Sequence, residues 1–444
     1  MQRRALTVVS VLATATATSA FLVARPRLDT LGAIALLTIG FVAWGAAVLT
    51  ARDAGSPRLV VLAIGAVLAV AVVVPPRGSH DLWGYVEYGR IVSEHDASPY
   101  ERVPADFPHD PLLPRMGSGY HRTRSPYGPA FTAISAVATG ATGSDPLPNR
   151  LAFQALEALA VAGALVVLWR RTRRTDALVW VGLNPVVVTA VVNDGHNDGL
   201  VMLCVLAGVV LAGGRRPWVA GLVLAAAALV KLPALLALGG LAIWMVHRRG
   251  RGDAARAVGA GLATVIAGYA VVGPDAIASI GDSGDLVSRA SVWGPVNDLL
   301  VSAGHAGIAD ALPAVSLVAV VGVAVLFALA GRTQPDPAAS TAGAASSFAL
   351  AGSYVLPWYT TWGLPTFATR RPTWLAWIVA AQGALLLLAY QLPHHANERA
   401  NGLLVHLTVT DVLPVVVLLA AVVVGAREVF LHRDERAHLR FARG

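Results

Sequence analysis

Long apolar runs alternate with short polar connections along most of the chain. Residues 31–50, 59–74, 311–331 and 412–425 are nearly free of charged side chains. A helix needs about 20 apolar residues to cross the hydrocarbon core of a bilayer. Such runs form helices and not strands, because backbone amides in lipid must be hydrogen bonded within their own segment. The pattern predicts an all-α, polytopic transmembrane helical bundle of about 13–14 spans.

The spans and loops suggest a division into four parts. We place the spans at about 6–24, 30–50, 59–75, 150–168, 178–192, 199–213, 217–230, 232–247, 255–273, 311–331, 342–356, 358–369, 373–391 and 409–426. The predicted parts are three N-terminal helices in 1–76, a long extracytoplasmic loop with interfacial helices in 77–149, a transmembrane core in 150–426 and a basic cytoplasmic tail in 427–444.

The charges indicate an orientation rather than a nucleic-acid partner. The formal net charge is +8, but the arginines are divided among the connections between spans. With the N-terminus in the cytoplasm, 22 of the 33 arginines lie on the inner side, as the positive-inside rule requires. We therefore predict a multi-pass plasma-membrane protein with both termini cytoplasmic. Residues 1–24 also resemble a signal peptide, and we favour an uncleaved anchor because another span follows directly.

The first long outer loop opens with the most informative polar stretch, residues 79–90. Ser79 is a plausible N-cap, which places Asp81 in the first turn of a surface helix, on one face with Tyr85. A partly desolvated carboxylate at the lipid–water boundary suits a general base acting on a hydroxyl. The alternative is that Asp81 only stabilises the N-terminus of its helix through the helix dipole.

Two further outer segments carry charged groups. The turn at 193–198 contains Asp194, His196, Asn197 and Asp198, which suit binding of sugar hydroxyls or assistance to the base, with a metal site as the alternative. Lys231 is the sole lysine and lies in apolar surroundings near the tip of a hairpin. Its compact charge suits a phosphate, and the alternative is snorkelling to the interface.

Aromatic and basic residues elsewhere in the outer segments complete the candidate set. Tyr100 and Tyr127 lie in Ser-Pro-Tyr motifs that suit either turns or stacking on a sugar. Trp358 and Tyr359 belong to an aromatic stretch suited to the membrane interface, and His395 and Arg399 lie in the last outer loop, where an anionic group can be met. The remaining ionisable group, Glu157, lies inside a span and is expected to pair within the bundle.

These motifs, in this order, resemble those of the GT-C superfamily of polyprenyl-phosphate-sugar-dependent glycosyltransferases. The chain is most similar to the actinobacterial polyprenol-phosphate-mannose α-mannosyltransferases, over about residues 75–400. The likeness rests on the following motifs: Asp81 with Tyr85 and Gly89, Ser98-Pro99-Tyr100, Ser125-Pro126-Tyr127-Gly128-Pro129, Leu183-Asn184-Pro185, Gly195-His196-Asn197-Asp198, Lys231-Leu232-Pro233 and Leu356-Pro357-Trp358-Tyr359. The family often has Asn-Pro-Tyr where this chain has Ser98-Pro99-Tyr100, so the sugar and the acceptor stay open.

The resemblance implies an inverting, single-displacement transfer of a sugar, most naturally mannose, to an envelope glycolipid or polysaccharide. Asp81 would be the base, and Lys231 with Arg399 would hold the phosphate of the lipid-linked donor. No cofactor is implied, and a divalent metal stays open. The alternatives are a lipid or glycolipid transporter or flippase, for which no repeat or midplane charge is evident, and a non-catalytic membrane assembly partner.

Overall fold

The computed structural model describes residues 2–54, 56–284, 286–392 and 407–441, and all regular elements in these ranges are helices. The predicted all-α, polytopic membrane fold is confirmed. Six described helices are long and apolar enough to cross a membrane, or seven if one bent pair forms a single span, and five shorter apolar helices accompany them. This is fewer than the 13–14 spans expected from hydropathy.

Two compact units share the chain. Unit 1 contains residues 1–204, 226–232 and 263–285, and unit 2 contains 205–225, 233–262 and 286–444. The helices of unit 1 are α1 (Gln2–Ala24), α2 (Thr30–Ala54), α3 (Pro57–Val73), α4 (Asp81–Ser93), α5 (Pro129–Thr142), α6 (Pro146–Thr172), α7 (Thr175–Gly182) and α12 (Asp275–Gly284). The helices α8 (Asp198–Ala212), α9 (Pro217–Val230) and α11 (Arg251–Val272) contribute residues to both units.

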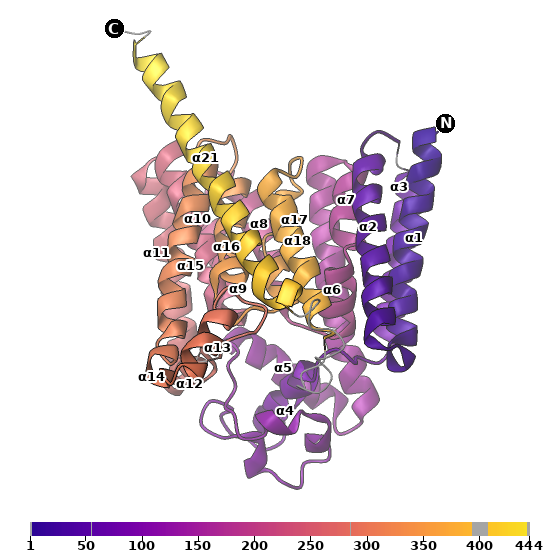
Figure 1. The fold of residues 1–444 in the computed structure, drawn as a ribbon. Helices are drawn as coiled ribbons and strands as arrows, with labels where there is room; N and C mark the ends of the chain where they lie inside the picture. Colours follow the sequence, from indigo (N-terminus) through magenta and orange to yellow (C-terminus); the bar gives the residue numbers. More distant parts are fainter. Residues whose placement is uncertain (1, 55, 285, 393–406, 442–444) are drawn as a thin grey trace. The chain divides into compact units, whose positions relative to one another are not determined.

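In unit 1, α1, α2 and α3 run side by side, and α4 and α5 lie at one end of these long helices (Figure 1). The α4–α5 contact is close because Gly89 has no side chain. A Cβ atom there would lie 2.6 Å from the carbonyl oxygen of Ser135 on α5. A hydrogen bond of 3.0 Å between the hydroxyls of Ser93 and Thr139 continues this contact. The pairing fixes the helix that begins with Asp81.

The span predicted at 178–192 is broken. The helix α7 and the π-helix η5 (Val187–Asn193) meet at a bend of 56°. Pro185 lies at the break, where it cannot donate a backbone hydrogen bond. The Asn184 side chain accepts a hydrogen bond of 2.9 Å from the Val186 amide and thereby caps the segment that follows. The bend delivers the chain to the polar turn at 193–198.

Unit 2 consists of α10 (Leu235–Arg248), α13 (Gly294–Ser302), α14 (Ala306–Ala309), α15 (Leu312–Gly331), α16 (Ala338–Ala351), α17 (Leu364–Phe367), α18 (Trp374–Ala389) and α21 (Leu413–Phe441). The helices α10, α15 and α16 pack against one another (Figure 1). Gly240 permits this approach, because a Cβ atom there would lie 2.5 Å from the backbone oxygen of Ser340.

Two local predictions were wrong. The span expected at 358–369 is a 3-10 turn (Pro357–Thr361) followed by α17, which has only four residues. Pro357 and Pro365 interrupt the helical hydrogen-bond pattern there. The N-cap position of α4 is His80 rather than Ser79, although the Ser79 hydroxyl still accepts a hydrogen bond of 3.0 Å from the Asp81 amide. Asp81 therefore lies in the first turn of α4, as expected.

Candidate active site

Asp81 lies at the start of α4 with its carboxylate partly open to the surface. Its side chain is 29% exposed, whereas Tyr85, one turn further along the same face, is fully buried. Burial alone raises the pKa of Asp81. A hydrogen bond from His196, the positive charges of His196 and Lys231, and the Ser79 hydroxyl outweigh this effect and lower the pKa below its ordinary value. The carboxylate is thus held in its ionised form.

His196 lies directly behind Asp81. Its Nε2 atom is 3.5 Å from the Asp81 carboxylate, and its Nδ1 atom is 2.7 Å from the carbonyl oxygen of Ala190. A carbonyl only accepts, so Nδ1 must carry a proton. The other ring nitrogen, Nε2, is therefore the atom that faces the Asp81 carboxylate.

The turn at 193–198 is anchored to the end of α3. The side-chain amide of Asn193 donates to the carbonyl oxygens of Ala71 and Val74, at 2.9 and 2.8 Å. Gln154 on α6 donates to the same two carbonyls and, at 2.6 Å, to the Asn193 carbonyl. These bonds satisfy carbonyls at the end of a helix and fix the turn against α3 and α6.

Asp194 connects this turn to the segment that leads into α4. Its carboxylate accepts a hydrogen bond of 2.8 Å from the Gly78 amide and lies 3.7 Å from the Arg25 guanidinium. Burial raises the pKa of Asp194, and the charges of Arg25 and His196 and the Gly78 amide offset this only in part. A Cβ atom on Gly78 would lie 2.0 Å from the Asp194 carboxylate, so only glycine fits here.

Lys231 and Asp198 form a buried ion pair at the other side of the turn. The Nζ atom is 2.6 Å from the Asp198 carboxylate, and the side chains are 11% and 0% exposed. Lys231 lies between α9 and α10, and the preceding Val230 carbonyl accepts a hydrogen bond from Gly128. The backbone next to Lys231 is thus joined to the segment that leads into α5.

Three buried polar groups lie beside this ion pair, and none has a hydrogen-bond partner of good geometry within the described residues. They are the Tyr85 hydroxyl, the Asn197 amide and the Glu157 carboxylate. The first turn of α8 lies against Glu157, where a Cβ atom on Gly199 would come within 2.3 Å of the carboxylate. Burial and the neighbouring charges of Asp81, Asp198 and Glu157 raise the pKa of Tyr85 well above 10. Unsatisfied buried polar groups are rare in folded proteins and concentrate at functional sites.

The two tyrosines of the Ser-Pro-Tyr motifs pack within the segment 77–149. Tyr100 is buried and donates to the Tyr127 carbonyl at 3.0 Å, and its oxygen lies 2.8 Å from the Thr132 hydroxyl. Burial raises the pKa of Tyr100 to about 12. The Tyr127 ring meets the Tyr85 ring edge to face at 4.8 Å. These contacts support the walls of the site, and a role of either tyrosine in sugar binding stays a prediction.

None of the remaining predicted residues contacts Asp81 within the described part of the chain. Trp358 and Tyr359 belong to unit 2. Trp358 is 2% exposed, and the ring centroids of Tyr359 and Trp362 are 5.2 Å apart. His395 and Arg399 lie outside the described residues.

The acidic and imidazole groups of the turn at 193–198 point in three different directions. Asp194 faces Arg25, His196 faces Asp81 and Asp198 faces Lys231. No three His, Cys, Asp or Glu side chains converge as metal ligands within the described part of the chain. The geometry gives no support to the alternative of a metal held by this turn.

Sequence reasoning missed Arg25, Gly78 and Gln154, which position the site. Gln154 carried a usable signal, because a polar amide one turn before Glu157 on an apolar helix requires a partner. Gly78 and Arg25 carried none, since their importance arises only from contact with a residue more than 100 positions away.

Comparison with known proteins places this site in a family. Residues 3–248 match the family described as α-(1→6)-mannopyranosyltransferase, N-terminal domain. The chain belongs to this family. It is 25% identical over 421 residues to α-(1→6)-mannopyranosyltransferase A of Corynebacterium glutamicum, covering 84% of this chain and 82% of the relative. It is 28% identical over 335 residues to the protein of the same name from Mycobacterium tuberculosis, covering 68% and 63%. No solved structure matches the chain.

Membership confirms the prediction of a membrane-embedded glycosyltransferase, here a mannosyltransferase. Such an enzyme takes a sugar donor and a glycan acceptor. The alternatives of a transporter, a flippase and a non-catalytic assembly partner give way to this assignment.

Proposed function

We propose that this mannosyltransferase moves a mannosyl group from a polyprenyl-phosphate donor to a hydroxyl of an envelope glycolipid or glycan, on the extracytoplasmic face of the plasma membrane. The names of its relatives support an α-(1→6) linkage for the product. The observation that carries the proposal is Asp81, an ionised and partly exposed carboxylate at the opening of a buried polar cluster.

The proposed reaction is a single displacement with inversion. The acceptor O–H gives its proton to the Asp81 carboxylate while its oxygen forms a bond to the anomeric carbon. The bond between that carbon and the phosphate oxygen breaks, and polyprenyl phosphate leaves with the electron pair. A β-linked donor therefore yields an α-mannoside. This displacement requires no redox cofactor.

His196 supports Asp81 in this reaction. With Nδ1 held by the Ala190 carbonyl, Nε2 can only face Asp81. A fully buried imidazole fixed in this way orients the carboxylate, as the carboxylate–histidine pairs of other enzymes do. Once Asp81 has taken up the proton of the acceptor, it must release that proton to solvent before the next cycle.

The phosphate of the donor requires a cation, and Lys231 is the candidate in unit 1. It is already paired with Asp198 at 2.6 Å. A phosphate that reaches Nζ would share the lysine with Asp198. Arg399 remains a further candidate from the sequence.

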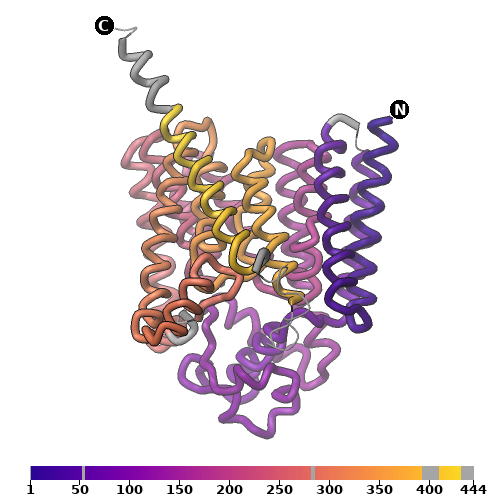
Figure 2. Tube along the Cα trace, viewed as in Figure 1, coloured from indigo at the N-terminus to yellow at the C-terminus, as the bar shows by residue number. Residues whose placement is uncertain are grey.

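The distribution of charge supports an extracytoplasmic site. In unit 1 the α2–α3 and α6–α7 connections lie at the end opposite α4 and α5 (Figure 2). Those connections carry Arg52, Arg58 and the four arginines of 170–174. By the positive-inside rule they face the cytoplasm, which directs Asp81 outward.

The test is transfer of labelled mannose from polyprenyl-phosphate mannose to glycolipid acceptors in membranes that contain the wild type, Asp81→Asn or the control Glu94→Gln. Glu94 is an exposed carboxylate at the other end of α4. Loss of a general base reduces turnover by about 100-fold or more, so Asp81→Asn is expected to lose nearly all transfer at normal protein level. Glu94→Gln is expected to retain it. A parallel assay with a chelator tests dependence on a divalent metal.

Equal transfer by Asp81→Asn and the wild type would reject Asp81 as the base. Transfer from a nucleotide sugar and not from the lipid-linked donor would reject the donor class while leaving the family assignment intact.

A further inference from the structure

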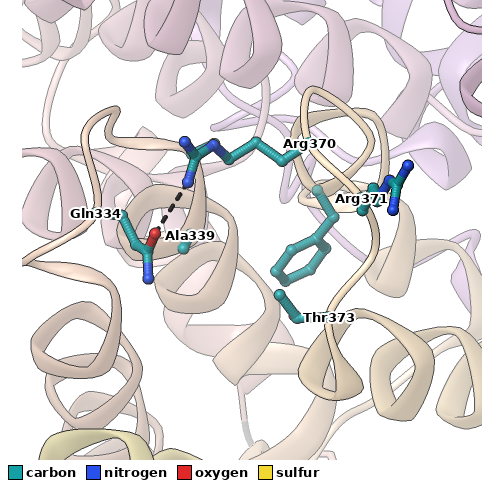
Figure 3. Close-up of a pocket in the computed structure, with 7 residues that line it drawn as sticks. Gln334, Ala339, Arg370, Arg371 and Thr373 are labelled. Atoms are coloured by element: carbon teal, nitrogen blue, oxygen red, sulfur yellow. Dashed lines mark hydrogen bonds between the residues drawn. The ribbon is translucent and has the colours of Figure 1, made fainter.

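A pocket of about 440 Å³ lies in unit 2, far along the chain from the residues discussed above. Its walls come from the connection between α15 and α16, the first residues of α16 and the segment that links α17 to α18. Figure 3 shows Arg370 reaching toward Gln334 on one side, with Arg371 and Thr373 on the other. No part of the proposed transferase chemistry uses this pocket.

The pocket has a positive character. Arg370 donates to the Gln334 side chain at 2.9 Å and pairs with Asp336 at 2.9 Å, so its charge is partly balanced. Arg371 is exposed and forms no ion pair within the described residues. Among the described residues, no carboxylate balances its charge.

Two helices also begin at the wall of the pocket. Ala338 and Ala339 are the first residues of α16, and Thr373 is the N-cap of α18. Side chains already cap both N-termini, since the Ala338 amide donates to the Asp336 carboxylate at 3.1 Å and the Ala376 amide to the Thr373 hydroxyl at 3.4 Å. The positive character of the pocket therefore comes from the arginines. Phe367 and the alanines supply an apolar floor. A tetrahedral anion attached to a less polar body fits this combination of lining groups.

We propose that this pocket binds a phosphate group, carried by a membrane-lipid headgroup or by a soluble phosphate compound. Trp374, directly after Thr373, is 75% exposed, as expected of a side chain at the lipid headgroup level. The pocket lies on the Arg332 and Arg370 side of unit 2, which the arginine distribution places in the cytoplasm. Basic pockets between helices on that side commonly receive lipid headgroups.

The experiment uses the purified, delipidated full chain and counts bound lipid by native mass spectrometry. Phosphatidylglycerol, a phosphodiester with a net charge, is compared with phosphatidylcholine, and inorganic phosphate is added as a soluble competitor. Arg371→Gln removes one positive charge from the pocket without breaking a described ion pair. The matched control is Arg215→Gln, an exposed loop arginine of the same unit that does not line the pocket.

Arg371→Gln is expected to weaken phosphatidylglycerol binding by about tenfold, because the site loses a charge-assisted hydrogen bond. Arg215→Gln is expected to change the binding little. Ala339→Leu, which fills the pocket without changing charge, is expected to weaken it as well. Displacement by inorganic phosphate would support a site for soluble phosphate, and its failure to displace would support a headgroup site. Equal binding of the two lipids, or equal effects of the two arginine variants, would overturn the proposal.

Discussion

Replacement of Gly78 by alanine tests whether Asp194 positions the catalytic helix. The added Cβ would lie 2.0 Å from the Asp194 Oδ2 atom, 2.5 Å from the Arg25 Nη1 atom and 2.8 Å from the Asp194 Cγ atom. Contacts this short cannot exist, so the carboxylate must move. It then loses the hydrogen bond from the residue-78 amide and its approach to Arg25.

The size of the effect follows from the burial of Asp194, whose side chain is 4% exposed. A hydrogen bond to a charged group contributes about 1.5–3 kcal/mol, and a buried carboxylate without its partner costs about 3–5 kcal/mol. We expect Gly78→Ala to destabilise the protein by about 3 kcal/mol. Because Asp81 follows three residues later, a displacement of about 1 Å would also reduce transfer by about 100-fold.

Thermal unfolding in detergent and the mannose-transfer assay measure the two effects. Gly119→Ala is the control, because a Cβ at that loop position has no atom within 4 Å. The variant Gly78→Ala/Asp194→Ala adds a second check. The closest clash is with Asp194, so adding Gly78→Ala to Asp194→Ala should cost less stability than Gly78→Ala costs in the wild type. The reasoning would be refuted if Gly78→Ala melted and transferred mannose like Gly119→Ala.

Three further predictions concern other buried contacts. Burial, with the Asp110 charge, raises the pKa of Glu87 to about 8 despite Arg90. The folded state therefore holds a proton that the unfolded chain releases from pH 4.5 upward, and stability should fall by at most about 1.4 kcal/mol per pH unit up to pH 8. Glu87→Gln should reduce the change of the melting temperature with pH across this window. The same change with pH in the variant and the wild type would contradict this. Gly89→Ala should destabilise the α4–α5 contact by about 1–3 kcal/mol in thermal unfolding, whereas Gly140→Ala, with 3.5 Å to its nearest atom, should not. Lys231→Gln should lower stability by about 3–5 kcal/mol because Asp198 stays buried, and Lys231→Gln/Asp198→Asn should recover part of the loss. No recovery would argue against the ion pair.

The sequence by itself determined the all-helical membrane class and the helix that begins near Asp81. These are local properties. A helix that crosses a bilayer needs a continuous run of apolar residues. The start of a helix favours particular polar residues at its N-cap, so it can be recognised from a few neighbouring residues. The order of weak motifs was also sufficient to indicate the mannosyltransferase family, which the comparisons then confirmed.

The tertiary structure alone decided which groups meet. Gly78 and Asp194 are 116 residues apart, Lys231 and Asp198 are 33 apart, and no local pattern records either contact. Hydropathy also predicted one continuous helix at 358–369, where the chain instead forms two short pieces that each begin near a proline. The apolar pattern of a segment shows whether that segment can lie in the bilayer. The partners of buried charges depend on how segments distant in sequence pack, and that is decided by the whole fold.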